Sequence, residues 1–194
     1  SLKNGYPIGS VLFWKPDTNI KKDLIVEEIQ LIGGYSLENS ESQDYQFILD
    51  GYQRLSTLFG CFIDSNSTKL KQNIEERKKF DFYYDLKEDK FERNKISKGS
   101  LDYFQVPLYY FFDGNHFYDF TESLVSLNFT EDEKKLFISR YKSFGAKISS
   151  YDIPAIELIG GSIKEAVNIF SRLNSTGITF SDDWKVSALS FNKE

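Results

Sequence analysis

The most informative pattern of apolar and polar positions lies in residues 45–63. Residues 45–49 form a short run of apolar and aromatic side chains that is typical of a strand, and Asp50 and Gly51 then favour a turn. Apolar side chains next recur at the spacing of one helical face, at Leu55, Leu58, Phe59, Phe62 and Ile63. The pattern therefore predicts a strand, a tight turn and a helix, around which we expect the chain to be organised.

Composition and alternation predict three further strands. Residues 6–14 and 152–159 are rich in β-branched and aromatic side chains, and residues 80–86 alternate between rings and polar groups. The turn-forming residues 87–89 then predict a hairpin. Residues 23–36 fit either a helix or an edge strand, because their apolar spacing suits a helix and their glycine pair suits a strand.

Start signals predict two helices. Residues 128–145 carry Thr130 followed three positions later by Glu133, and Ser162 and Glu165 repeat this capping box. The second helix would turn Ile163, Ala166, Val167, Phe170 and Leu173 inward and end at residues 174–177. The charged residues 69–79 predict a short helix, and residues 182–191 predict a last one. Mixed strands and helices of this kind predict an α+β fold.

Length and composition fit one domain with a proper core. The chain has 194 residues, of which 40% are apolar and 16% aromatic, so we expect a core rich in ring packing. No run approaches the roughly 20 apolar residues that a bilayer span requires, and no signal peptide is apparent, which predicts a cytoplasmic protein. The chain opens at Ser1 and has no methionine, so we expect a fragment of a longer protein. Residues 70–150 could form a helical and aromatic insertion.

Metal and thiol chemistry find little support. The single cysteine, Cys61, excludes an internal disulfide, and its apolar helix favours a core position over a nucleophile. The single histidine, His116, lies in a turn-like composition and excludes a multi-histidine metal site. Asp81 and Asp85 share the outward face of a predicted strand, where solvated carboxylates are more common than metal ligands.

The charge pattern argues against a stand-alone DNA-binding domain. The formal net charge is −5, whereas affinity for duplex DNA comes largely from neutralised phosphates. Two basic clusters, residues 69–79 and 134–147, are interleaved with acidic residues, so we interpret them as solvated helix faces, with nucleic-acid contact as the less favoured alternative. The pattern G-x-x-x-x-G-K-[ST] is absent, which excludes a P-loop.

Polar side chains gather where the central helix starts. A helix N-terminus offers unpaired N–H groups and partial positive charge, so Arg54 beside it could bind an anion. Asp50, at the tip of the preceding strand, could hold a cation or orient water. The alternative is that Asp50 only caps the helix and that Arg54 is only solvated.

Three segments resemble a known family. Residues 48–58 read Ile-Leu-Asp-Gly-Tyr-Gln-Arg-Leu-Ser-Thr-Leu and resemble the strand and Asp-Gly-Gln-Gln-Arg-Leu-Thr-Thr-Leu signature of the N-terminal domain family of GmrSD-type restriction endonucleases. Residues 166–181 resemble its Phe-x-x-x-Asn-x-x-Gly-x-x-Leu-Ser segment, and residues 6–14 give a third, weaker match. The family is similar in fold to ParB and sulfiredoxin. The resemblance implies one such domain, which binds and hydrolyses a nucleotide and governs a DNA nuclease in bacterial defence.

The resemblance also implies a nucleotide site. Asp50 would bind Mg²⁺ or orient the attacking water, Gln53 would position water or base, and Arg54 would hold phosphate oxygens. The remaining contacts to a nucleoside triphosphate would come from Gly51, Tyr52, Thr57, Asn174, Ser175, Thr176 and Gly177. As a plain helix end and turn, residues 174–177 would need no ligand.

One position departs from the family signature. Tyr52 stands where the family has its first glutamine, so base stacking could replace a hydrogen bond, or binding could persist without hydrolysis. The competing hypothesis is a sensor module without catalysis that recognises DNA or a partner protein through the ring-rich residues 103–120. Under both hypotheses a nuclease centre would lie outside this chain, because the sequence contains no HNH motif.

Overall fold

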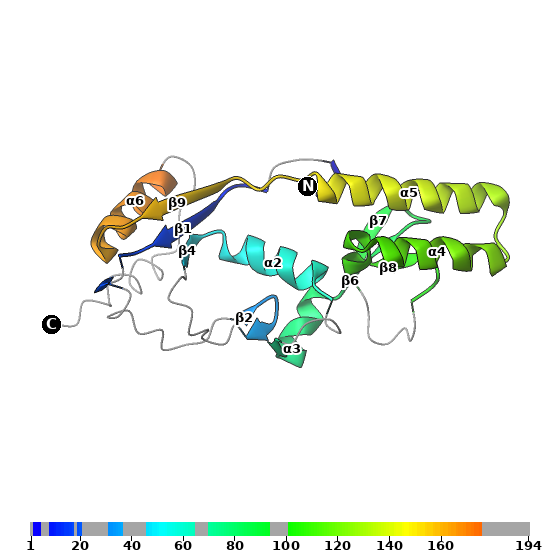
Figure 1. Ribbon diagram of the computed structural model, residues 1–194, viewed down its shortest axis with the longest axis horizontal. Coiled ribbons are helices and arrows are strands. Elements are labelled where there is room, and N and C mark those ends of the chain that lie inside the picture. Colours follow the sequence, from blue (N-terminus) through cyan, green and yellow to red (C-terminus); the bar gives the residue numbers. More distant parts are fainter. Residues whose placement is uncertain are drawn as a thin grey trace. The chain divides into compact units, whose positions relative to one another are not determined.

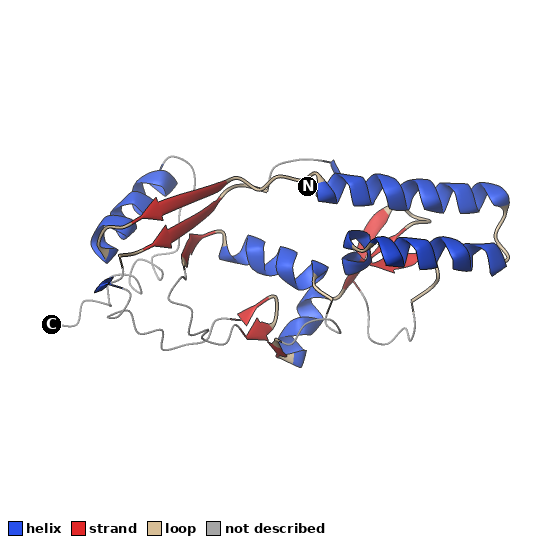
Figure 2. Cartoon of the chain, viewed as in Figure 1, coloured by secondary structure: helices blue, strands red, loops and turns tan. Residues whose placement is uncertain are grey.

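The computed structural model describes residues 2–4, 8–17, 19–20, 31–36, 46–64, 70–93 and 101–175. The helix predicted for residues 182–191 lies outside this part of the chain. Two compact units are present, and each contains segments that are distant in sequence. Unit 1 comprises Ser1–Gly9, Glu28–Ser40 and Gln53–Ile153, and unit 2 comprises Ser10–Glu27, Glu41–Tyr52 and Pro154–Glu194. The mixture of helices and small sheets confirms the predicted α+β class (Figure 2).

Unit 2 is built on a three-stranded sheet. Its order is β4 (Phe47–Asp50), β1 (Val11–Lys15) and β9 (Ala155–Ile159), with β1 antiparallel to β4 and parallel to β9 (Figure 1). The apolar and β-branched residues that predicted these three strands therefore pair with one another. Trp14 fixes the turn after β9, because its Nε1–H donates to the Gly160 carbonyl at 2.8 Å.

Helix α6 (Ile163–Ser175) follows β9 in unit 2. The predicted capping box is present, since the Glu165 carboxylate accepts from the Ser162 backbone and hydroxyl while the Ser162 hydroxyl accepts from the Glu165 N–H. Ala166 and Phe170 are buried, as the helical spacing predicts. Leu173 is 45% exposed, so its predicted inward position is wrong. It lies in the last turn of the helix, on the same helical face as Ala166 and Phe170.

In unit 1, a small sheet packs beside the central helix α2 (Tyr52–Phe62). Its strands are β2 (Leu31–Ile32), β3 (Tyr35–Ser36) and β5 (Lys71–Gln72). The end of the ambiguous region 23–36 is therefore a hairpin. Residues 69–79 contain β5 and then a shorter helix than predicted, α3 (Ile74–Arg77), which runs into η2 (Lys78–Phe80).

Helix α2 buries its small side chains most deeply. Ser56 and Gly60 are its buried residues, whereas the apolar residues predicted to face the core are only partly buried. The cause is a close backbone approach: a Cβ on Gly33 would lie 2.4 Å from the Gly60 Cα. The Gly33 N–H donates to the Ser56 hydroxyl at 2.8 Å. Arg77 closes the contact, because its Nη1 donates to the carbonyls of Gly33 (2.8 Å) and Gly60 (2.5 Å).

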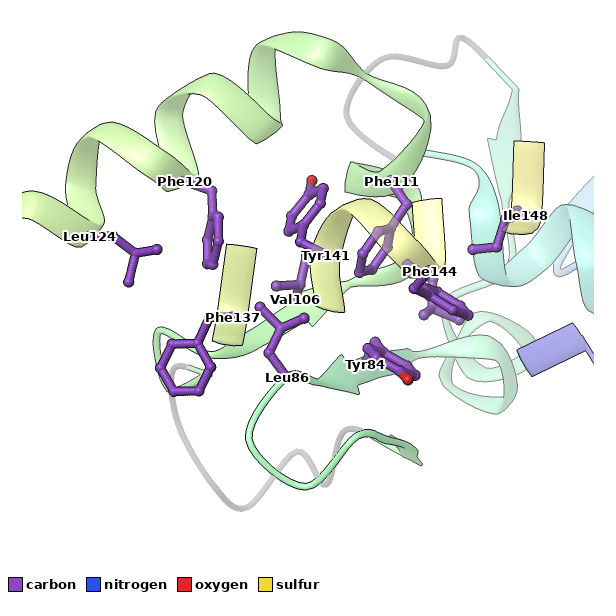
Figure 3. Packing of buried hydrophobic residues seen from close by; sticks show 11 residues of the cluster. Tyr84, Leu86, Val106, Phe111, Phe120, Leu124, Phe137, Tyr141, Phe144 and Ile148 are labelled. Carbon is purple, nitrogen blue, oxygen red and sulfur yellow. The ribbon is translucent and has the colours of Figure 1, made fainter. Parts of the chain in front are cut away.

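The main core of unit 1 joins a second sheet to two long helices. The sheet is β7 (Lys90–Arg93), β6 (Phe82–Asp85) and β8 (Gln105–Pro107), and it is followed by η4 (Leu108–Phe112), α4 (Gly114–Ser126) and α5 (Glu131–Ser149). The short η1 (Leu2–Asn4) lies against α5. Figure 3 shows the rings of Tyr84, Phe111 and Phe144 together with the apolar side chains around them. The Tyr84 and Phe144 rings are stacked, with centroids 4.2 Å apart.

Two local predictions in this region are wrong. Asp85, expected on a solvated face, is only 4% exposed. Its carboxylate accepts the N–H groups of Lys87 and Glu88 at 2.8 Å each and so forms the predicted hairpin turn, while Asp81 is exposed. His116, expected in a turn, lies in the first turn of α4 because the Asp113 carboxylate caps that helix.

Candidate functional site

Asp50 ends strand β4, and Gly51 connects it to α2. Asp50 pairs in register with Leu12 of β1 and is partly buried. Gly51 is buried and has a φ of +88°, in the left-handed region where a residue without Cβ is favoured. The Asp-Gly sequence therefore has a local cause: the glycine allows the chain to leave the strand and begin the helix within one residue.

The first turn of α2 carries the predicted phosphate-binding residues. The division between the two units falls between Tyr52 and Gln53, so Gln53, Arg54 and Thr57 belong to unit 1. Gln53 and Thr57 are exposed, and the Thr57 hydroxyl donates to the Gln53 carbonyl at 2.8 Å. This first turn contains no acidic side chain, so its positive end is not neutralised from within.

Arg54 lies against the backbone of Gly9. A Cβ added to Gly9 would lie 3.3 Å from Arg54 Nη1 and 3.6 Å from Cζ. Gly9 has a φ of +93°, and the Arg54 Nε atom is buried. Two of the three sequence segments singled out above thus meet in unit 1. Sequence reasoning did not select Gly9 as a site residue, because its contact with Arg54 joins segments far apart in sequence.

The structure covers the downstream segment only in part. Asn174 and Ser175 are the last residues of α6, so this helix continues through Ser175. Thr176 and Gly177 lie outside the described residues. The prediction that these four residues share a pocket with Arg54 therefore stays a prediction.

A metal cluster and the single cysteine are the other candidates for chemistry. Within the described part of the chain, no group of three or more histidine, cysteine, aspartate and glutamate side chains could hold a metal ion. Cys61 packs against the aromatic core, and burial raises the pKa of its thiol to about 11, with Arg77 acting in the opposite direction. A thiol with so high a pKa is a poor nucleophile at neutral pH, which agrees with a core role.

The ring-rich residues 103–120 mainly build the core. Phe111 and Phe120 are buried, and several neighbouring rings pack on the same cluster: Tyr103, Phe104, Tyr110 and Phe117. Phe112 and Tyr118 are 54% and 66% exposed. Most of the rings that could have stacked a base are thus engaged with one another.

No helix within the described ranges is long and apolar enough to cross a membrane. A sequence model of the GmrSD restriction endonuclease N-terminal domain matches residues 1–190 of this chain. The search of curated proteins found no match to this chain. The match covers the strand β4, the start of α2 and the segment that contains Gly9.

Proposed function

Because the chain belongs to the family of GmrSD restriction endonuclease N-terminal domains, we propose that it binds and hydrolyses a nucleoside triphosphate with Mg²⁺. Its place is in a restriction protein, and hydrolysis would govern a nuclease domain or subunit of that protein. DNA would be involved only through this partner, and the setting would be the bacterial cytoplasm during defence against foreign DNA.

The start of α2 carries the proposal. Arg54 combines with a helix N-terminus whose first turn has no acidic side chain. Its guanidinium lies against a glycine backbone, which holds the charged group next to a surface without side-chain bulk. Backbone N–H groups and a planar guanidinium together suit the oxygens of a phosphate chain. Asn174, Ser175, Thr176 and Gly177 would complete the contacts to the nucleotide.

Asp50 and Gln53 would take the remaining roles. Gln53 is exposed and could orient the water that attacks the γ-phosphorus. Asp50 would bind the metal ion or orient that water. The bond between the γ-phosphorus and the β-phosphate oxygen breaks as the water attacks, and the released phosphate takes up the proton. Phosphoryl transfer depends mainly on such placement and on charge compensation.

The residues present are compatible with a magnesium ion. Mg²⁺ is commonly held by one or two carboxylates together with substrate phosphates and water. Asp50 supplies one carboxylate at the end of β4, so a larger acidic cluster is not required. The ion would offset the negative charge of the phosphates.

Calorimetric titration with each of the four common nucleoside triphosphates and Mg²⁺ tests binding, and phosphate release tests hydrolysis. We expect Arg54→Ala to abolish detectable binding and Gln53→Ala to retain binding but reduce phosphate release by on the order of 10²–10³. Gln53 is exposed, so its variant should fold normally. Arg93→Ala, which also removes a guanidinium from unit 1, is the matched control and should leave both measurements unchanged.

Each outcome has a defined meaning. The absence of a calorimetric binding signal with every nucleotide would overturn the proposal and favour the sensor module. Binding without phosphate release would show a regulatory nucleotide site instead of an NTPase. In that case Tyr52→Gln, which restores the family residue, should be tested for a gain of hydrolysis.

A further inference from the structure

A separate polar cavity, open to solvent on one side, lies in unit 1, with a volume of about 170 Å³. It is bordered by Lys3 of η1, by Asp89 of the β6–β7 hairpin and by one face of α5. From α5 come Arg140 and Lys147. None of the residues assigned to the nucleotide site lines it. The sequence alone suggested that the basic residues 134–147 are a solvated helix face. Part of that face instead lines a cavity in which a ligand can bind.

The charge around the cavity is positive. Lys3, Arg140 and Lys147 face a single carboxylate, that of Asp89. This carboxylate already has two partners, since Oδ2 accepts from Lys3 Nζ at 2.7 Å and Oδ1 accepts from the Tyr84 hydroxyl. Although partial burial acts to raise it, these hydrogen bonds hold the pKa of Asp89 below its ordinary value. Asp89 thus stays charged and positions Lys3, and an excess of positive charge remains.

The cationic side chains that line the cavity have N–H donors beyond those used in their hydrogen bonds to Asp89, Leu86 and Lys87. The Lys3 ammonium donates to the Asp89 carboxylate and carbonyl, which leaves one of its three protons. Both hydrogen bonds of Arg140 use Nη1, which donates to the carbonyls of Leu86 (2.8 Å) and Lys87 (2.6 Å). These bonds fix the guanidinium and leave Nη2 and Nε as donors. Lys147 forms no ion pair with any residue that the structure describes.

Two serines on the same face of α5 add hydroxyl groups. Ser139 and Ser143 line the cavity, and neither hydroxyl is hydrogen-bonded to another of the described residues. Elsewhere in this unit, helical hydroxyls bond back to the preceding turn: Ser123 donates to the Asp119 carbonyl at 2.8 Å. Ser139 and Ser143 lack that bond and so can serve a ligand.

We propose that this cavity binds a phosphate group. Several cationic donors and two hydroxyls converge on one small space, and a tetrahedral oxyanion has enough acceptor oxygens to satisfy them. Pockets for complete small molecules are usually about 300 Å³ or more, while one water occupies about 30 Å³. The cavity therefore suits one phosphate and not a whole nucleotide. The phosphate could be free or could belong to the backbone of DNA.

Amide chemical shifts of the full chain, recorded in phosphate-free buffer during titration with inorganic phosphate, test the site. We expect saturable shifts at residues 139–147. Lys147→Gln should weaken this binding about fivefold or more, because it removes a charged donor. Lys135→Gln is the matched control: Lys135 is exposed on the same helix, lies outside the cavity and carries the same charge, so its variant should bind like the wild type.

A second arm identifies the source of the phosphate. A short DNA duplex replaces inorganic phosphate in the same titration. Shifts at residues 139–147 that Lys147→Gln weakens and Lys135→Gln does not would assign a backbone phosphate. Shifts with inorganic phosphate alone would assign a free one. Absence of saturable shifts in both arms, or equal effects of the two variants, would overturn the proposal.

The same titration on Arg54→Ala keeps this site distinct from the nucleotide site. We expect the phosphate response at residues 139–147 to persist there, because Arg54 does not line the cavity. Loss of that response in Arg54→Ala would contradict an independent site. If the chain does not bind nucleotide, the phosphate proposal is unaffected. If the cavity does not bind phosphate, the nucleotide proposal is unaffected.

Discussion

At the scale of single residues, the contact between α2 and the β2–β3 hairpin depends on missing side chains. Gly33 and Gly60 approach so closely that a Cβ on either would collide with the other or with Phe80. Arg77 then donates to both carbonyls and lies over the Tyr35 ring, 4.7 Å from its centroid. The absence of two methyl groups is therefore what permits this contact to form.

Gly33→Ala should destabilise the protein by about 3 kcal/mol or more, because it adds backbone strain at a φ of +59° to a clash with backbone atoms. Urea denaturation measures the loss. Gly114→Ala is the control, since a Cβ there would meet nothing within 4 Å and alanine favours the helix. A loss below about 1 kcal/mol for Gly33→Ala would show that the hairpin can move away from α2.

Cys61 should react slowly with alkylating reagents in the native protein. Its pKa is raised from 9.0 to about 11, mainly by burial, so the thiolate fraction at pH 8 falls by about a hundredfold relative to the unfolded chain. Rates of iodoacetamide modification with and without denaturant test this. Because the folded pKa is the higher one, this group's contribution to stability is present below pH 9.0 and is lost as the pH rises toward about 11. Equal alkylation rates in both states would contradict the prediction.

At the scale of elements, the starts of α5 and α6 were predictable from the sequence, whereas the start of α4 was not. The capping boxes of α5 and α6 are both present, because a hydroxyl and a glutamate three residues apart can satisfy each other's backbone. The hairpin around residues 87–89 was predictable for a similar local reason. The buried face of α2 was not predictable, since the contact of Gly60 with Gly33 depends on a partner distant in sequence.

Thr130→Ala should lower the free energy of unfolding by about 1 kcal/mol, because the N–H of Glu133 loses its capping acceptor. Chemical denaturation gives the value. Thr121→Ala is the matched control, since Thr121 lies inside α4 and its hydroxyl only donates to the Tyr118 carbonyl. Equal losses in the two variants would mean that the cap at Thr130 does not stabilise α5.

The charge of Glu133 should add a pH-dependent contribution. Hydrogen bonds from the backbone and hydroxyl of Thr130 hold its pKa below the ordinary 4.5. The carboxylate therefore stabilises the fold above that pH, and its contribution is lost as the pH falls through the folded value. The stability difference between wild type and Glu133→Gln, measured by urea denaturation from pH 7 to pH 3, should shrink on acidification. A difference that stays constant would contradict this.

At the scale of the whole molecule, the described elements differ in how deeply they are buried. In unit 1, Tyr84 of β6, Leu86 just after that strand, and Phe137 and Phe144 of α5 share one ring-rich core. In unit 2, most residues of β9 are exposed, including Ile159 at 77%. Local opening requires less free energy where fewer apolar contacts are lost.

Hydrogen exchange should reflect that difference. Amides of β6 and of the middle of α5 should exchange only through global unfolding, whereas amides of β9 should exchange orders of magnitude faster. Exchange measured by NMR at several denaturant concentrations separates the two regimes. Equal protection of β9 and α5 would contradict the prediction.

The candidate site was predictable only in its local part. The order Asp50, Gly51, Tyr52 follows from a strand, a left-handed glycine and a helix, all readable from neighbouring residues. The contact of Gly9 with Arg54 joins segments far apart in sequence, and no local pattern indicates it. The single-domain organisation, the likeness to ParB and sulfiredoxin and the complete pocket stay predictions.

The glycine contact near the C-terminal end of α2 has a consequence for Arg54. Gly60 and Arg54 belong to the same helix, α2. A bulkier residue at position 33 would push the β2–β3 hairpin and α2 apart, and a tilt of the helix would displace Arg54 at its other end. If Arg54 binds nucleotide as proposed, substitutions in the hairpin should also weaken that binding, although the hairpin contributes no residue to the proposed site.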